Sequence, residues 1–291
     1  MKAIEWNDRF SIGVEIVDHA HQKLFSIVRK LNRLSQNSRK NEWTCMEGIK
    51  YFKNYAVTHF AQEEAYMRSV GYGGYEMHKR LHDNMVNHTL PVFEMELVKS
   101  GYSEDVLAQF LNFCSGWLTE HILIEDRAIT GKVSSKWVHE QSEEELIGFS
   151  QAVIGVLEQE FRLDAMLASR YYSSEDIGNA YYYRFLYRTK DGRKQQVFLA
   201  FEEQLLLYMA GRIQKERFMK MEKRVLDSIG TLSTRIVDGI GERFAQIDSY
   251  QAEKDNMLTY DQFIKVFERE YPYYSMLFRT NRGFFAVCAV K

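Results

Sequence analysis

Apolar residues in the first half of the chain recur every three or four positions, with polar residues between them. Within residues 15–37 this row consists of Leu24, Val28 and Leu31, and His21 continues it backwards by three positions. Such spacing places side chains on one face of an α-helix, which turns once in ~3.6 residues. The pattern therefore predicts a helix that carries a histidine on its buried face.

Three further helices with the same periodicity follow. The second begins near Thr44, a residue type that often caps helix N-termini, and a glycine-rich stretch ends it. Its inward row consists of Ile49, Phe52, Ala56, His59, Glu63 and Met67. The third helix carries His78 and His82 in register with Met85, and the fourth opens at Ser103. The inner row of the fourth helix is formed by Leu107, Phe110, Cys114, Trp117 and His121.

Four amphipathic helices joined by short connections predict an antiparallel four-helix bundle, a fold that often holds metal ions between facing side chains. Pro91 stands where the third helix is expected to continue. Proline lacks a backbone N–H and crowds the preceding turn, so we expect a kink or a break near Leu90. His78 and His82 precede this point and should keep their positions.

A polar connection separates the predicted bundle from a region of different texture. Residues 131–148 break the apolar periodicity and include a short acidic run, which indicates a linker or a connecting helix. The 291 residues of the chain exceed one typical domain of about 100–200 residues. We therefore divide the chain into a domain at 1–132, a linker at 133–148 and a domain at 149–291.

The second domain combines helical and strand-like segments. Two pairs of aromatic and aliphatic segments predict β-hairpins, the first around Asp191-Gly192; the pairs are 181–188 with 194–201, and 275–279 with 284–290. Helices are predicted at 150–170, 202–214 and 217–245. Residues 258–267 fit either a strand or a helix. Together these segments predict an α+β domain.

The charge balance limits the classes of partner. The chain carries 38 basic and 40 acidic residues, a formal net charge of −2, so it has no basic excess for nucleic-acid phosphates or an anionic membrane.

The N-terminal residues lack a signal-peptide pattern, and no stretch approaches the ~20 apolar residues of a membrane span. Three widely spaced cysteines, Cys45, Cys114 and Cys288, suit a reducing compartment as small buried side chains. We expect a soluble, cytoplasmic protein.

The inward rows of the four predicted helices carry histidines and carboxylates that an apolar core does not tolerate unpaired. They are His21, His59, Glu63, His78, His82, His121 and Asp126. Burial of so many polar groups without partners is very costly, and metal coordination removes that cost. Five imidazoles and two potentially bridging carboxylates exceed the needs of one ion, so the set predicts a two-metal centre. Nitrogen-rich octahedral coordination suits iron, with manganese, cobalt and zinc as alternatives.

Other residues near these rows receive simpler assignments. His19, His88 and His139 lie off the inward rows and are predicted at the surface. Met67 and Met85 are predicted as core-filling side chains, since thioether sulfur is a poor donor for iron of this kind. No histidine follows a glutamate by three residues, unlike the Glu-x-x-His motif of ferritin-like di-iron enzymes, which argues against an oxygenase.

The ligand types, their order and their spacing resemble the hemerythrin family over about residues 4–130. The matching motifs are W-N-D-R-F-S-I-G-V, HQKLF in the first helix, HFAQEE at 59–64, HKRLH at 78–82, and W-L-T-E-H-I followed by Asp126. The resemblance implies two non-haem iron ions with an oxo or hydroxo bridge: His78, His82 and His121 on one ion, His21 and His59 on the other, and Glu63 and Asp126 between them. It also implies a vacant position on the second ion where dioxygen binds reversibly. Trp117 and Leu118 match the positions that line the oxygen pocket.

The second domain resembles the CheC and CheX chemotaxis phosphatases over about residues 150–291. The likeness rests on the order helix, hairpin, helix, helix, hairpin and on V-L-D-S-I-G-T-L-S-T-R-I-V-D-G at 225–239. Where that family has an acidic residue and an asparagine three residues apart, this chain has Thr231 and Thr234. A threonine hydroxyl replaces neither group, so we expect no phosphatase activity. The resemblance still implies a homodimer contact through this domain, and a response regulator or another signalling protein as partner.

Three kinds of function fit these observations. The first is an oxygen or redox sensor whose metal centre acts on a catalytically degenerate output domain, with oxygen, nitric oxide and redox state all open as the signal. The second is an oxygen or iron carrier or storage protein, in which the second domain serves assembly. The third is an enzyme, through either a peroxidase-type di-iron reaction or phosphoaspartate hydrolysis. The presence of a second domain favours the sensor.

Overall fold

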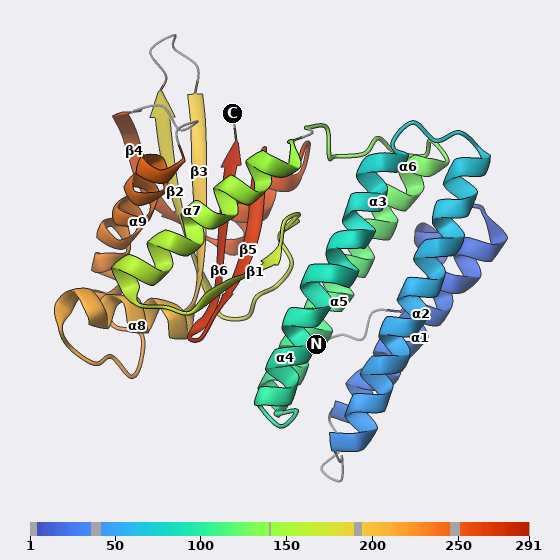
Figure 1. The fold of residues 1–291 in the computed structure, drawn as a ribbon, viewed down its shortest axis with the longest axis horizontal. Coiled ribbons are helices and arrows are strands. Elements are labelled where there is room, and N and C mark those ends of the chain that lie inside the picture. The colour runs from blue at the N-terminus through green and yellow to red at the C-terminus, as the bar shows by residue number, and fades with distance from the viewer. Residues whose placement is uncertain (1–4, 36–41, 140, 189–193, 245–250, 291) are drawn as a thin grey trace. The chain divides into compact units, whose positions relative to one another are not determined.

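The computed structural model describes residues 5–35, 42–139, 141–188, 194–244 and 251–290. The chain forms two compact units, Met1–Val138 and His139–Lys291. The first is all-helical and the second combines helices with a sheet (Figure 1). The predicted multidomain class, an all-α part followed by an α+β part, is confirmed.

The first unit is a four-helix bundle (Figure 1). Its first two members are α1 (Glu15–Ser35) and α2 (Glu42–Ser69), and a 3-10 turn at Asp8–Phe10 precedes them. Thr44, predicted as the N-cap of the second helix, lies inside α2. The helix is already formed at Glu42, whose carboxylate suits the positive end of the helix dipole.

The third member of the bundle is one continuous helical run with a wide turn in it. It begins as α3 (Tyr75–Asn84), passes through a π turn at Met85–Thr89 and continues as α4 (Leu90–Lys99). Pro91 is the second residue of α4, directly after the π turn, so its missing N–H falls at the irregular part of the run rather than inside a regular α-helix. The chain does not break at the proline. The distortion predicted near Leu90 takes the form of the π turn, which a helix with a local defect commonly adopts.

The fourth member also contains a π turn. It begins after Ser103 as α5 (Glu104–Glu120), widens at His121–Asp126 and ends as α6 (Arg127–Ile129). The predicted start at Ser103 is confirmed. Short connections join the successive runs, so neighbouring runs point in opposite directions (Figure 1), as the antiparallel bundle requires.

The second unit is built on a six-stranded antiparallel sheet with the strand order β1-β5-β6-β3-β2-β4. The strands are β1 (Ala165–Ser169), β2 (Ala180–Arg188), β3 (Lys194–Glu202), β4 (Gln251–Leu258), β5 (Tyr274–Thr280) and β6 (Gly283–Val290). The helices are α7 (Glu143–Phe161), α8 (Glu203–Gln214), α9 (Lys223–Arg243) and α10 (Tyr260–Ile264). Both predicted hairpins are confirmed, as β2 with β3 and β5 with β6. Asp191-Gly192 lies outside the described residues.

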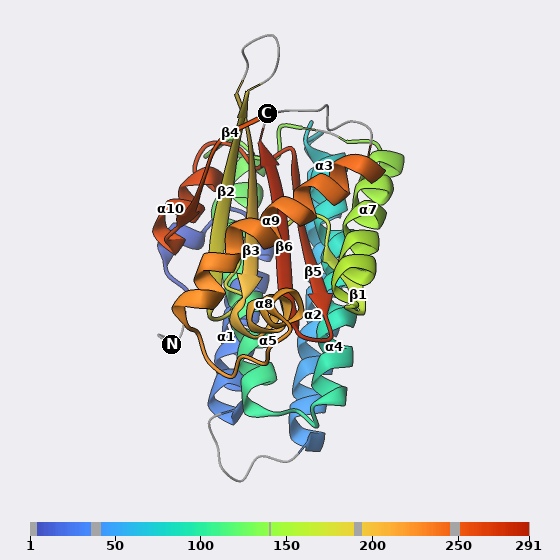
Figure 2. The ribbon, with the colours of Figure 1, turned by 90° about the vertical axis from the view of Figure 1, so that its left-hand side faces the viewer.

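Helices cover both faces of this sheet. Successive strand residues point to opposite faces, and Tyr182 and Tyr183 show which helix lies on which side. The Tyr182 ring stacks on Phe263 of α10, with centroids 4.6 Å apart. The Tyr183 hydroxyl lies against Gly230 of α9. Figure 2 shows α9 lying across the strands on the side that it shares with α8.

The helix predicted at 150–170 differs in extent from α7. Ser142 and Glu145 form a capping box that starts the helix earlier, at Glu143. The helix ends at Arg162, which has a left-handed backbone (φ 55°). Residues 165–169, predicted as its last turns, form β1 instead.

One other prediction for this unit is corrected, and one open alternative is resolved. The helix predicted at 217–245 begins at Lys223, and residues 245–250 lie outside the described part of the chain. The ambiguous segment 258–267 is helical from Tyr260, as α10 followed by a 3-10 turn at Lys265–Phe267. The strand β4, which precedes it, was not predicted.

None of the helices in the described ranges is both long and apolar enough to cross a membrane. Cys45, Cys114 and Cys288 are all buried and free of disulfides. Burial raises the pKa of the Cys114 thiol, and it raises the pKa of Cys288 to about 12. These three side chains are apolar core residues, as the sequence predicted.

Candidate metal centre

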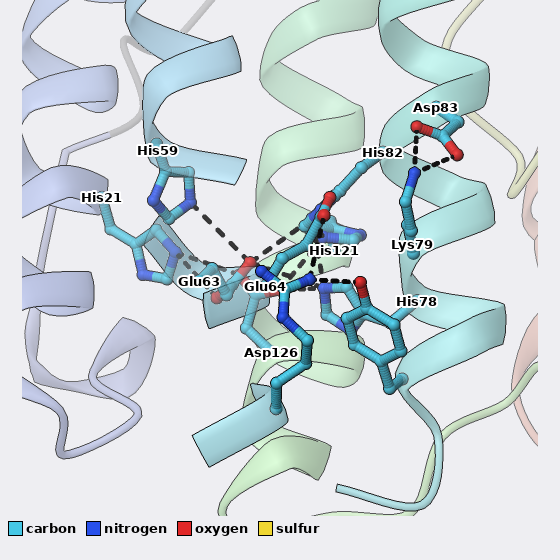
Figure 3. A network of polar contacts seen from close by, with 12 residues as sticks. His21, His59, Glu63, Glu64, His78, Lys79, His82, Asp83, His121 and Asp126 are labelled. Carbon is cyan, nitrogen blue, oxygen red and sulfur yellow. Dashed lines mark hydrogen bonds and ion pairs between the residues drawn. The ribbon is translucent and has the colours of Figure 1, made fainter. Parts of the chain in front are cut away.

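Seven polar side chains converge in the core of the bundle (Figure 3). α1 contributes one, α2 two, α3 two and the π turn after α5 two. All seven are at most 5% exposed; they are His21, His59, Glu63, His78, His82, His121 and Asp126. The structure thus brings together every residue predicted as a metal ligand. The regular spacing of the inward rows accounts for His21, His59, Glu63, His78, His82 and His121, whereas Asp126 follows His121 by five residues.

Three imidazoles face one another on one side of the centre. His82 Nε2 lies 3.2 Å from His78 Nε2 and 3.1 Å from His121 Nε2. Oε2 of Glu63 lies 3.5 Å from His78 Nε2 and 3.3 Å from His82 Nε2. These four residues offer ligand atoms that all lie within 4.8 Å of one another, which fits one metal ion.

Two imidazoles and both carboxylates form the second group. His21 Nε2 lies 3.0 Å from Asp126 Oδ2 and 4.0 Å from Glu63 Oε1. His59 Nε2 lies 4.0 Å from Glu63 Oε2. The ligand atoms of His21, His59, Glu63 and Asp126 also lie within 4.8 Å of one another. Glu63 therefore belongs to both groups.

Asp126 also lies between the two groups. Its Oδ1 is 3.0 Å from His121 Nε2 and 3.3 Å from His78 Nε2, while its Oδ2 faces His21. A carboxylate with one oxygen toward each group can bridge two ions. The division of the histidines into three and two is the one that the family resemblance implies, and metal binding by these residues stays a prediction until ions are counted.

A π turn makes the five-residue spacing of His121 and Asp126 suitable for a common ligand site. In an α-helix residues five apart differ by about 140° around the axis, because each residue turns ~100°. The π turn at His121–Asp126 widens the helix so that hydrogen bonds run to the residue five positions away. The two side chains therefore point to the same side and come within 3.0 Å.

The protein atoms alone do not satisfy this cluster. The atoms His21 Nδ1 and Nε2, both oxygens of Glu63 and both oxygens of Asp126 are buried without a hydrogen-bond partner. The Nε2 atoms of His78, His82 and His121 point at one another. One N–H between two of these rings makes a single hydrogen bond, so the third Nε2 is left without a partner. Bound cations would satisfy these lone pairs together, so the donor set fits a pair of metal ions.

The pKa shifts in the cluster favour ionised carboxylates and, at two of the histidines, neutral imidazoles, so the cluster can accept positive charge. Burial lowers the pKa of His59 to about 3 and that of His121 to about 4, which keeps both imidazoles neutral and able to bind metal. Burial also opposes protonation of His78, but Asp126 and Glu63 outweigh it and raise its pKa to about 10. The carboxyls of Glu63 and Asp126 are buried, yet the surrounding histidines hold their pKa values below the usual range.

An apolar cavity lies beside the cluster, and two of the aromatic side chains that line it stack on histidines. It is lined by Leu24, Phe52, Ala56, Phe60, Met85, Leu90, Cys114, Trp117 and Leu118. The space open to the centre of a water-sized sphere is about 10 Å³, which is close to the smallest that holds one water molecule. Phe60 stacks on His82 and Trp117 stacks on His121, with centroids 4.0 and 4.3 Å apart. The structure thus places Trp117 and Leu118 on the wall of a very small apolar pocket beside the cluster.

A further carboxylate, not singled out by the sequence, contacts the cluster from outside. Glu64 Oε1 lies 3.2 Å from Nδ1 of His82, on the ring side opposite Glu63 (Figure 3). Two adjacent glutamates therefore hold the two nitrogens of one imidazole. The sequence shows both residues but gives no sign that the second reaches a histidine of the next helix.

We expect the substitution Glu64→Ala to weaken metal binding by about 10–100-fold, the range found when the outer partner of a ligand histidine is lost. Without the carboxylate the His82 ring loses the contact that fixes its orientation. Competition with a calibrated chelator measures the affinity. Glu64→Gln keeps an acceptor at the same place and serves as control, and equal affinities of the alanine variant and the native protein would contradict the expectation.

The other residues singled out in the sequence lie at or near the surface of their own units. His19 is exposed, and His88 and His139 are half-buried. Thr231 and Thr234 are exposed on α9, and the Thr234 hydroxyl donates to the carbonyl of Gly230 at 3.0 Å. The structure therefore gives the two threonines a surface position.

An all-α bundle with five inward histidines and two shared carboxylates defines a class of helical proteins built around two metal ions. The model of the hemerythrin HHE cation binding domain matches residues 12–133. A bacteriohemerythrin of Clostridium acetobutylicum is 34% identical over 129 residues, which cover 42% of this chain and 95% of the relative. A hemerythrin of Siphonosoma cumanense is 28% identical over 129 residues, covering 44% and 92%. The chain belongs to the hemerythrin family.

Solved structures match about half of the chain at low similarity. The chemotaxis protein CheX of Vibrio vulnificus is 14% identical with a TM-score of 0.37, and covers 52% of this chain and 99% of its own. A CheC-like superfamily protein from a Shewanella species is 13% identical with a TM-score of 0.36, and covers 52% and 100%. The sheet order and helix positions given above define the fold of the second unit independently of these matches.

Proposed function

We propose that this chain is a non-haem di-iron protein that binds dioxygen reversibly and acts as an oxygen or redox sensor. The observation that carries the proposal is the enclosure of two ligand groups, with shared carboxylates, beside a small apolar pocket. Two ferrous ions supply the electrons that reversible binding of dioxygen requires. Membership of the hemerythrin family supports iron over the other metals that these donors accept.

The side chains of the bundle favour binding without turnover. Phe60, Trp117 and Leu118 are at most 8% exposed and keep water from the histidines. A dry pocket offers no proton donor and no route for an external reductant, which oxygen reduction would need. Cys114 lines the pocket, but burial raises the pKa of its thiol and keeps it neutral. The pocket therefore supports carriage or sensing rather than a peroxidase-type reaction.

The second unit supports a signalling role rather than simple carriage. A bundle alone would suffice to bind oxygen, yet this chain adds a second compact unit of its own. We propose that this unit is an output domain that contacts a response regulator or another signalling protein and forms a homodimer. The exposed Thr231 and Thr234 lack the acid and the amide of the phosphatases that it resembles, so we expect no hydrolysis of phosphoaspartate.

The central test follows the visible spectrum of the protein while iron is counted. The purified chain is reduced without air, exposed to air and then returned to argon. The proposal expects two irons per chain and an absorption band that appears in air and disappears under argon. Loss of iron, or a band that only decays to an oxidised form, would refute reversible binding. Steady consumption of peroxide would favour the enzymatic alternative instead.

A second test concerns the output domain. Phosphorylated response regulators lose their phosphate at their own rate, and the full chain is expected to leave that rate unchanged. Acceleration by the chain would show that the second unit is a phosphatase despite its threonines. Protease sensitivity and oligomeric state, compared between the reduced and oxygenated forms, test sensing. If protease sensitivity and oligomeric state are identical in the two forms, the result would favour oxygen carriage or storage over sensing.

We expect the substitution Leu118→Asn to shorten the lifetime of the oxygenated form about tenfold, which corresponds to ~1.4 kcal/mol of barrier. Leu118 is 4% exposed and lines the apolar pocket, so an amide there admits water and offers a proton. Decay of the oxygenated spectrum measures the lifetime. Leu111→Asn also places an amide in the core of α5, at a residue 1% exposed that does not line this pocket. Equal lifetimes of the two variants would contradict a role for the pocket.

A further inference from the structure

A second pair of side chains with the same spacing accompanies His121 and Asp126, one at the last residue of α5 and one inside the π turn. Glu120 immediately precedes His121, and Glu125 immediately precedes Asp126. The two glutamates therefore form a row, five residues apart, directly beside the row of the two predicted ligands. Each glutamate is joined to its neighbouring ligand by one peptide unit, which is rigid and planar.

The buried glutamate of this row contacts the segment by which the chain leaves the bundle. Glu125 is 3% exposed, yet it takes no part in either ligand group. Its Oε2 accepts a hydrogen bond from the Ser135 hydroxyl at 2.6 Å, and its Oε1 accepts one from the Lys136 backbone N–H at 3.2 Å. Hydrogen bonds to a charged acceptor in a buried site are among the stronger ones.

The other glutamate holds the same segment by its side chain. The Lys136 ammonium lies 3.0 Å from Glu120 Oε1, with the lysine side chain only 16% exposed. The Ser135 hydroxyl also accepts a hydrogen bond from the backbone N–H of Trp137 at 3.2 Å. Residues 135–137 are thus fixed to both ends of the π turn, immediately before Val138, where the first unit ends.

We propose that Glu120 and Glu125 are a latch through which the metal centre controls the segment 135–137, and through it the start of the second unit. The inference rests on the proposed function, since it names how that function is regulated. A π turn is a local departure from the regular α-helix and is frequent at functional sites. Metal ions that hold His121 and Asp126 together hold the π turn, and the π turn holds the two glutamates in reach of Ser135 and Lys136.

Loss or change of a ligand then has a defined consequence. If the turn relaxes toward α-helical geometry, residues five apart separate by about 140° around the axis. Glu120 and Glu125 can then no longer face the same segment, and residues 135–137 are released. The segment is the covalent path to the second unit, so its release alters how that unit is held. The coupling requires two states of this segment, the π turn and the regular α-helix, and bound metal favours the π turn.

Hydrogen exchange of the full chain tests the latch. Amide exchange in residues 134–138 is measured with two ferrous ions bound, under anaerobic conditions, and again after iron is removed by chelation. We expect exchange about tenfold or more slower with iron in the native chain. The double variant S135A/K136M loses both side-chain contacts and keeps only the hydrogen bond from the backbone N–H of residue 136 to Glu125, so we expect most of the iron-dependent difference in exchange to disappear. Exchange in α5, measured in the same samples, shows that the bundle stays folded.

A matched lysine on the same segment provides the control. The Lys132 ammonium lies 3.0 Å from the carbonyl of Ser11 and does not contact the π turn, so K132M should keep the iron-dependent protection of the native chain. Protection that for the most part persists in S135A/K136M, or that is absent in the native chain with two irons bound, would overturn the latch and leave oxygen binding intact. A native chain that binds no iron would overturn both the proposed function and the latch.

Discussion

The substitution Glu63→Ala is expected to reduce bound iron from two ions per chain to at most one. Glu63 is fully buried, and its Oε2 lies 3.3 Å from His82 Nε2 and 4.0 Å from His59 Nε2, so it contacts both groups of ligands. Its loss removes an anionic ligand from both groups at once. The negative charge of Glu63 would offset the repulsion between two neighbouring cations. Without it the repulsion is stronger, so we expect the second cation to be lost.

Elemental analysis of protein loaded anaerobically and passed through a desalting column measures this effect. Glu64→Gln is the matched control, because Glu64 is the next residue and contacts only the outer nitrogen of His82. The control should hold two irons per chain. Retention of two tightly bound irons by the alanine variant would show that Glu63 is not a shared ligand, and the two-ion reading of the cluster would fail.

Removal of the metal is expected to cost the first unit most of its stability. A ligand present at a thousand times its dissociation constant stabilises the folded state by about 4 kcal/mol, and two such ions by about 8 kcal/mol. The whole stability of a domain is about 5–15 kcal/mol. Without ions, the buried oxygens of Glu63 and Asp126 also stay unpaired in the core.

Thermal unfolding with and without a strong chelator measures the change. A fall in the melting temperature of the bundle on the order of 20 °C is expected, while the second unit should unfold at an unchanged temperature. Two separate transitions, only one of which responds to the chelator, would agree with the division into two units. A bundle that melts at the same temperature without metal would contradict the assignment of the cluster as a metal site.

The metal cluster could be predicted from the sequence because helical periodicity carries most of the information. His59 and Glu63 lie four residues apart, and so do His78 and His82, so each pair shares a face of a regular helix. His121 and Asp126 did not fit this rule. The π turn that aligns them depends on the packing of the bundle and on the ligands themselves, and no local residue pattern specifies it.

Contacts made across the fold were beyond the reach of the sequence. Glu64 and Glu125 look like any other surface glutamates in a helix, and only the structure shows that one reaches His82 and the other Ser135. Such pairings depend on which helices become neighbours. Sequence periodicity shows which residues face inward, but it does not show which residue of another element they meet.

Two strands of the second unit escaped prediction for opposite reasons. The β1 segment, AMLAS, follows closely on an apolar helix, so its residues extended the helical row. The β4 segment, QAEKDNML, is mostly polar and lacks the alternation of a half-buried strand. It lies at the edge of the sheet beside β2, where charged residues are common because they discourage pairing with other chains. The hairpins were predictable because both of their strands are apolar.

The buried thiols of Cys45, Cys114 and Cys288 can report how often the surrounding core opens. A thiol reagent can modify these side chains only when the surrounding core separates, so the rate of labelling counts the excursions of each unit from its closed form. Cys114 beside the oxygen pocket reports on the bundle, and Cys288 in β6 reports on the sheet. The labelling rates of the individual cysteines thus give the opening rate of each unit separately, without an added dye.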